Sequence, residues 1–171
     1  MSFWDFFQKQ LGQNQEGSEQ QKYSRLHDKI VQHLPKNATE KDQVLTVCLA
    51  GLLARIAYID LKIEQAEKTH MEKILKDFTD LDDQTIRSTV QLASDEIEDL
   101  AGEENHLYCY PLNDLLQTDE KYHILEALFT FAASDGTADN QESEEIRLIS
   151  KALLLEHKHY VAAKATVRKY L

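Results

Sequence analysis

One segment of this chain occurs twice, 75 residues apart, and the duplication limits the folds open to it. The first copy spans residues 52–75 and the second spans 127–150. Apolar positions meet apolar positions at helical spacing, and three acidic positions recur in each copy. This predicts a duplicated helical unit with an acidic connection in each half. The identical pairs are Leu53/Leu128, Ala57/Ala132, Asp60/Asp135, Glu67/Glu142 and Ile74/Ile149.

Composition favours an all-α fold. The chain has 171 residues, of which 42% are hydrophobic, enough for one domain with a substantial core. Its 5 Gly and 2 Pro are too few for the turns of a β-sandwich or barrel. We therefore expect one helical domain over residues 22–171, with pseudo-symmetric three-helix halves at about 40–95 and 115–170.

Hydrophobic periodicity places the individual helices. Thr39 is the expected N-cap of the most apolar helix, with Asp42 at its third position. The stretch 101–118 reads as less regular, because Gly102 and Pro111 interrupt it. In the last helix, Val161 and Ala165 align with Ile86 and Val90 at the same offset, as Val167 aligns with Leu92. The expected helices span about 20–33, 40–59, 65–78, 83–97, 119–134, 139–154 and 157–170.

The first residues form a separate unit in this reading. Residues 1–12 are amphipathic and aromatic, and the polar linker 13–21 follows them. Phe3, Trp4 and Phe7 share one helical face and would form a large exposed apolar patch if they floated free. We expect this arm to dock on the domain, on a partner or on a membrane surface, with docking on its own domain favoured.

Charge and cysteine content exclude several classes of function. The formal net charge of −11 repels phosphate backbones, so we expect no nucleic-acid partner. Cys48 and Cys109 do not make a zinc site or a disulfide framework. The most apolar stretch, 44–59, falls short of the ~20 residues of a transmembrane helix. No signal peptide is evident, and the cytoplasm is the expected location.

The acidic connections are the candidate metal sites. Asp60 and Asp135 are expected in the last turn of a helix, where the helix dipole disfavours a carboxylate by ~0.3–1 kcal/mol. A cation, a base or a nearby donor would compensate. The alternative is capping, since Asp139 and Glu142 have the spacing of a capping box. Oxygen ligands favour Ca²⁺, Mg²⁺ or Mn²⁺. The candidate ligands are Asp60, Glu64, Glu67, Asp135, Asp139 and Glu142.

Two Glu-x-x-His motifs offer another chemistry. Glu67–His70 and Glu120–His123 have the spacing of di-iron ligands in a four-helix bundle. They occupy non-equivalent places in the repeat, which argues against a shared site. No GxSxG, Walker, Rossmann or HExxH motif occurs, so catalysis has no other support and no catalytic residue is predicted.

The second copy, with Asp135-Gly136 and Glu142 seven residues after the aspartate, resembles the tellurite-resistance TerB-like domain. Asp60 and Glu67 match the same pattern without the glycine, and the start MSFWDFF is similar to the leader of some TerB proteins. The resemblance covers roughly 40–171. It implies an all-helical domain of two related halves whose acids bind metal. It also implies a role in bacterial stress response, through protein partners in a membrane-associated complex peripheral to the inner membrane.

Three hypotheses follow from the sequence. The first is a non-enzymatic TerB-like module that binds partners and a divalent cation. The second is a passive helical adapter without metal, in which every acid is a cap or a surface charge. The third is a metallo-enzyme built on Glu67, His70, Glu120 and His123.

Overall fold

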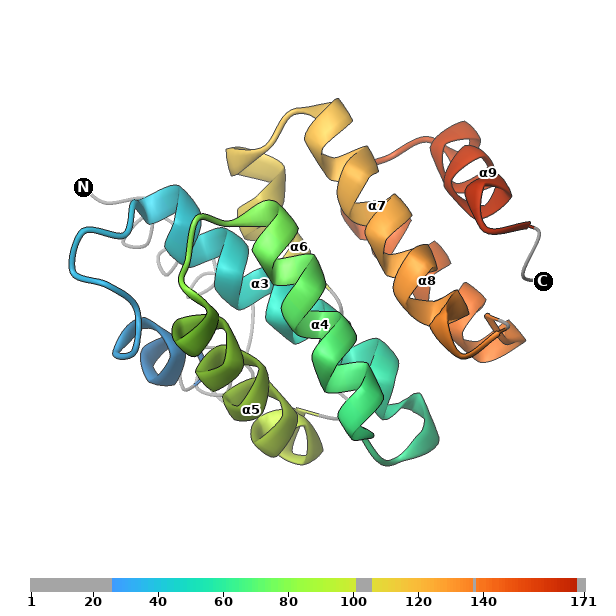
Figure 1. The fold of residues 1–171 in the computed structure, drawn as a ribbon. Helices are drawn as coiled ribbons and strands as arrows, with labels where there is room; N and C mark the ends of the chain where they lie inside the picture. The colour runs from blue at the N-terminus through green and yellow to red at the C-terminus, as the bar shows by residue number, and fades with distance from the viewer. Residues whose placement is uncertain (1–25, 101–105, 137, 169–171) are drawn as a thin grey trace.

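The computed structural model describes residues 26–100, 106–136 and 138–168. Over these residues the chain is helical and contains no β-strand, which confirms the predicted all-α fold (Figure 1). The arm at 1–12 and the linker at 13–21 lie outside the described residues. After a helical segment at 26–31, the elements are α3 (Glu40–Ala57), η1 (Tyr58–Asp60), α4 (Gln65–Phe78), α5 (Asp83–Leu100), α6 (His106–Leu115), α7 (Thr118–Ala132), η2 (Ala133–Asp135), α8 (Asn140–Ala152) and α9 (His157–Thr166).

Helix α3 forms the centre of the core, because it is apolar on almost its whole circumference. Every residue from Val44 to Ala54 is buried, and helices α4 to α8 all pack against α3. Thr39 caps the helix as predicted, since its Oγ accepts the backbone N–H of Asp42 at 3.1 Å. The segment Glu40–Asp60 is long and apolar enough to cross a membrane, but 72% of its apolar window is buried inside the fold. Core packing therefore accounts for its apolarity.

The helix boundaries repeat with the sequence offset. Helices α3 and α7 end at Ala57 and Ala132, and η1 and η2 follow at once. Helices α4 and α8 then begin at Gln65 and Asn140. Each pair of boundaries is 75 residues apart, the offset read from the sequence. Superposition of the two halves in space stays a prediction.

The third helix of each half breaks the pattern. Ile86 and Val90 of α5 are 2% and 1% exposed, whereas Val161 of α9 is 51% exposed and Ala165 is exposed as well. The prediction that apolar positions keep their phase into the last helix is therefore wrong. Helix α5 packs on both α3 and α4, but α9 lies at the edge of the molecule against α7 and α8 (Figure 1). The buried residue of α9 is consequently Ala163, rather than the aligned Val161 or Ala165.

Helix α6 replaces the irregular stretch predicted between the halves. It forms despite Pro111 in its interior, and it packs against α3. The contact depends on Gly51 of α3, because a Cβ there would lie 2.5 Å from Cε1 of the buried Tyr108. Gly51 thus permits a close approach that Ala would obstruct.

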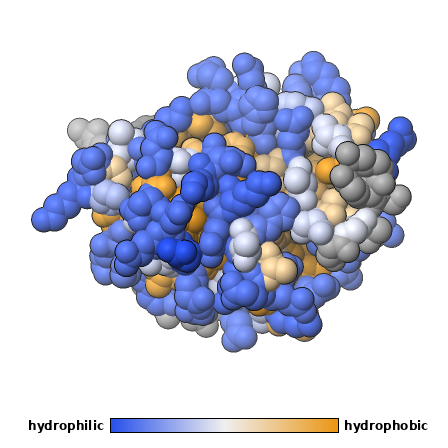
Figure 2. Space-filling view, viewed as in Figure 1, coloured by the Kyte–Doolittle hydropathy of each residue, from blue (hydrophilic) through white to orange (hydrophobic). Residues whose placement is uncertain are grey.

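The face of the molecule seen in Figure 2 is predominantly hydrophilic. On the face seen in Figure 2, polar and charged residues cover most of the surface and hydrophobic residues appear as scattered patches. This agrees with the charged fraction of 29% and the net charge of −11. The described residues on this face therefore form no single large apolar surface.

Candidate functional site

The first acidic connection combines a strained turn with an ion pair. Asp60 ends η1, and Leu61 follows in the left-handed conformation with φ 63°. Glu64 is the N-cap of α4, and its backbone N–H donates to Glu67 Oε2 at 2.7 Å. The Glu64 carboxylate accepts from Lys62 Nζ at 2.6 Å. Glu67 thus fixes the start of α4, while Glu64 pairs with a base in the same loop.

The second connection repeats this geometry with a complete capping box. Gly136 follows η2 with φ 117°, as expected for the residue that ends the helix. Asp139 Oδ1 accepts the Glu142 backbone N–H at 2.8 Å, and Glu142 Oε2 accepts the Asp139 backbone N–H at 2.8 Å. Asp135 ends η2, and its side chain lies outside what the structure describes. The predicted cap of α8 is therefore confirmed.

The two connections meet at the same end of the molecule, beside α4 and α7 (Figure 1). A cleft of about 440 Å³ lies between them. Four of the six candidate ligands line it, whereas Asp139 does not. Four carboxylates against one lysine ammonium give the lining a formal charge of −3. The lining residues are Asp60, Lys62, Glu64, Ala66, Glu67 and His70 from the first half, and Phe131, Ala132, Ser134 and Glu142 from the second.

The acids of the cleft change the pKa of Lys62. Its pKa is raised, chiefly by the hydrogen bond and charge of Glu64, with smaller contributions from Asp60 and Glu67. The pKa of Glu64 is lowered by the same hydrogen bond and charge. Both groups are solvent-exposed, so this pair can open at little cost in free energy. Lys62 is therefore the base that compensates the acids of the first connection.

His70 adds a neutral imidazole to the cleft. Its ring packs against Phe131 with centroids 5.6 Å apart. Burial lowers the pKa of His70, and the charge of Lys73 lowers it further. The neutral ring that results is the form that binds metal ions. As the side chains stand, however, no three His, Cys, Asp or Glu groups in the described part of the chain are grouped to hold a metal ion.

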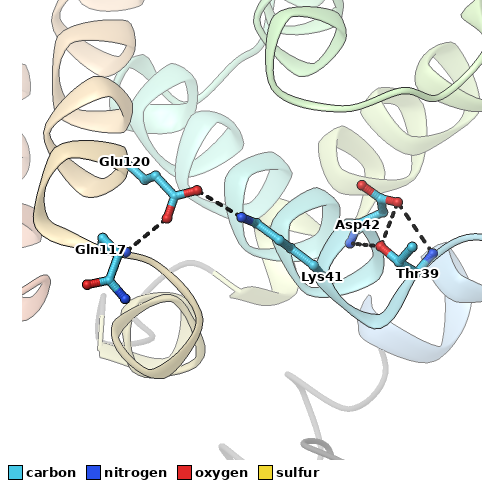
Figure 3. A network of polar contacts seen from close by, with 5 residues as sticks. All are labelled: Thr39, Lys41, Asp42, Gln117 and Glu120. Atoms are coloured by element: carbon cyan, nitrogen blue, oxygen red, sulfur yellow. Dashed lines mark hydrogen bonds and ion pairs between the residues drawn. The ribbon is translucent and has the colours of Figure 1, made fainter.

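The second Glu-x-x-His motif lies elsewhere. Glu120 accepts from Lys41 Nζ at 2.8 Å and from the Gln117 backbone N–H at 2.9 Å, which ties the starts of α3 and α7 together (Figure 3). His123 is exposed and pairs with Glu126 at 3.0 Å. Glu120 is about 16 Å along α7 from Phe131, which packs on His70. The two motifs therefore do not share one cluster, contrary to what the metallo-enzyme hypothesis requires.

Four cleft residues were not singled out from the sequence. Lys62 follows Asp60 by two residues, and this alternation of acid and base is a signal that could have been read. Phe131 corresponds by offset to Ile56, a core residue, so its pattern indicated only burial. Ala66 and Ser134 carry no signal of their own. Only the packing of the two halves brings these side chains to the acids.

Comparison with known proteins agrees with the pattern of the two connections. Residues 46–165 match the family model described as Tellurite resistance protein TerB. The match covers most of the chain and includes both acidic connections. No curated protein and no solved structure matches the chain significantly.

Proposed function

The chain belongs to the TerB family of tellurite resistance proteins, and we propose that it is a non-enzymatic binding module of a bacterial stress response. The supporting observation is the acidic cleft, which takes Asp60, Glu64 and Glu67 from one repeat and Glu142 from the other. Two of these acids, Glu67 and Glu142, also accept hydrogen bonds at helix N-termini. Groups fixed in this way suit a preformed binding surface.

We propose that this cleft takes up a divalent cation. Four carboxylates and one exposed ammonium leave an excess of negative charge, most of which a doubly charged ion would offset. Oxygen ligands suit Ca²⁺, Mg²⁺ or Mn²⁺. Binding would open the Lys62–Glu64 ion pair, because the ammonium and the ion compete for the same carboxylate. Lys62 thus acts as the internal competitor of the ion.

The partners in this proposal are proteins of a membrane-associated stress complex. The cytoplasm, at the periphery of the inner membrane, is the proposed location, as the family resemblance implies. The acidic surface supports protein partners with basic surfaces and argues against nucleic acid.

Thermal unfolding tests the cation proposal. Wild-type protein, Asp60→Asn and Lys62→Gln are each melted with EDTA and with millimolar Ca²⁺, Mg²⁺ or Mn²⁺. An ion that binds only the folded state stabilises it by about 2.7 kcal/mol at 100 times its dissociation constant. We expect an ion-dependent rise in Tm in the wild type, a smaller rise in Asp60→Asn, which removes one carboxylate of the cleft, and a larger rise in Lys62→Gln. Melting temperatures indifferent to all three ions in all three proteins would favour the passive adapter, with the acids acting only as caps.

A further inference from the structure

A second cleft, which shares no lining residue with the acidic one, lies along α4 and α5. Its volume is about 510 Å³, within the ~300–1,000 Å³ typical of ligand pockets. Helices α4 and α5 supply most of its lining residues, and His33, from the segment that follows the 26–31 helix, also lines it. The residues that line it are His33, Gln65, Lys68, Glu72, Arg87, Ser88, Val90, Gln91 and Leu92.

The charge of this cleft is opposite to that of the protein as a whole. Lys68 and Arg87 face it, and Glu72 is the one acid among its lining residues. Lys68 Nζ is held at the cleft by Gln91 Oε1 at 3.2 Å. Val90 is 1% exposed and Leu92 is half-buried, which gives the cleft an apolar floor. Cations above an apolar floor suit aromatic rings, which bury their bodies and attract the cations to their faces.

The part of the chain that the structure describes begins at Leu26, close to this cleft, and an aromatic segment precedes it in the sequence. An ion pair between Lys29 and Glu96 holds the 26–31 helix along α5. His33 lies seven residues after Leu26, about 10 Å away along that segment. Residues 12–25 connect the aromatic segment to Leu26 in the sequence, and a flexible chain of that length would reach about 20 Å. This reach covers the cleft with length to spare.

We propose that residues 3–11 of this chain dock in the α4–α5 cleft, with Trp4 or a neighbouring Phe placed over Lys68 and Arg87. The cleft has room for one or two aromatic side chains rather than the whole segment. Docking hides part of the apolar face that Phe3, Trp4 and Phe7 would otherwise present to water. A partner that binds the same aromatic face must first displace the segment from the cleft, so docking lowers the apparent affinity of the protein for that partner.

Trp4 is the only tryptophan in the chain, so its fluorescence reports on this segment alone. A nitroxide is attached at Ser88→Cys, inside the cleft, in the full-length protein. Cys48 and Cys109 are buried, so the introduced thiol is the reactive one. The matched control carries the nitroxide at Lys158→Cys, an exposed position on α9, which does not line the cleft. Nitroxides quench tryptophan emission only at short range, and we expect quenching from position 88 and none from position 158.

A second pair of variants tests the cations. In the Ser88→Cys background, Lys68→Gln with Arg87→Gln should reduce the ratio of docked to free segment by about two- to fivefold for each cation removed. Lys151→Gln with Lys158→Gln removes the same charge from exposed positions outside the cleft and should leave quenching unchanged. Water-like Trp4 emission with no quenching from position 88 overturns the proposal. Quenching from position 158, or quenching from position 88 that is unaffected by loss of both cations, overturns it as well.

Discussion

The contact between Gly51 and Tyr108 predicts that Gly51→Ala destabilises the fold, although helix propensity alone would make this change stabilising. A Cβ at Gly51 would lie 2.5, 2.7 and 3.0 Å from three atoms of the Tyr108 ring. Tyr108 is 1% exposed, so its ring has no open space to move into. Overpacking of this kind costs about 1–3 kcal/mol, and three close contacts in a closed core place this case near 3. Alanine gains about 1 kcal/mol over glycine inside a helix.

Gly51→Ala should therefore lower the free energy of unfolding by about 2 kcal/mol, the difference between these two effects. For a chain of this length that corresponds to a Tm lower by about 4–8 °C. Urea denaturation at neutral pH, followed by circular dichroism, measures the free energy directly. In a Tyr108→Ala background every ring atom that the new Cβ would meet is gone, and the same Gly51→Ala change should then raise stability by about 1 kcal/mol.

The reversal of sign is the decisive feature of this double-mutant cycle. A coupling of about 3 kcal/mol between the two positions is expected, because each change alters the contact that the other makes. If Gly51→Ala stabilised the wild type, or had the same effect in both backgrounds, the close approach of α6 to α3 would not be what requires glycine. The m-value should stay constant throughout, which excludes a change in the unfolded state as the cause.

Two further predictions concern charge. Burial lowers the pKa of His70 below its ordinary value of 6.5, so the unfolded chain binds protons more readily than the folded one. The free energy of unfolding should therefore fall as the pH drops below 6.5, and it should fall less in His70→Gln. Urea titrations between pH 7.5 and 5 measure this free energy. Arg55 Nε of α3 donates to Glu145 Oε1 of α8 at 2.5 Å, and both side chains are about one-fifth exposed or less. Arg55→Ala leaves the Glu145 carboxylate without this partner, so it should lower the free energy of unfolding by about 2–3 kcal/mol, as measured by chemical denaturation. Arg55→Met with Glu145→Met should cost less than Arg55→Ala alone, and an equal or larger loss would show that the pair itself stabilises the fold.

Sequence reasoning located the helix ends well, because caps and breakers act within a few residues. The Thr39–Asp42 pair starts α3, Asp139 and Glu142 start α8, and Gly136 ends η2, each as the spacing predicted. The same reasoning misjudged α6, since Pro111 does not prevent a helix there once packing on α3 favours one, and Gly102 lies outside the described residues. It also misplaced the buried face of α9, because that face depends on which neighbours the helix has.

The candidate site was predicted in its parts but not as a whole. Periodicity and repeat spacing identified Asp60, Glu64 and Glu67 as one acidic connection, and Glu142 as part of its counterpart. Their meeting in one cleft with Lys62, His70 and Phe131 depends on how α4 packs against α7, as in the ring contact of His70 with Phe131, which are 131 − 70 = 61 positions apart. No local pattern encodes that distance.

The sequence alone determined the helical class, the 75-residue repeat of helix boundaries and the placement of an acid at each connection, because these follow from composition, periodicity and interactions between near neighbours. Only the tertiary structure decided that the two connections share one cleft, that Asp139 lies outside it, and that Gly51 receives the ring of Tyr108. These outcomes depend on side-chain shape and on contacts between distant segments. Such contacts form only when the whole core is packed.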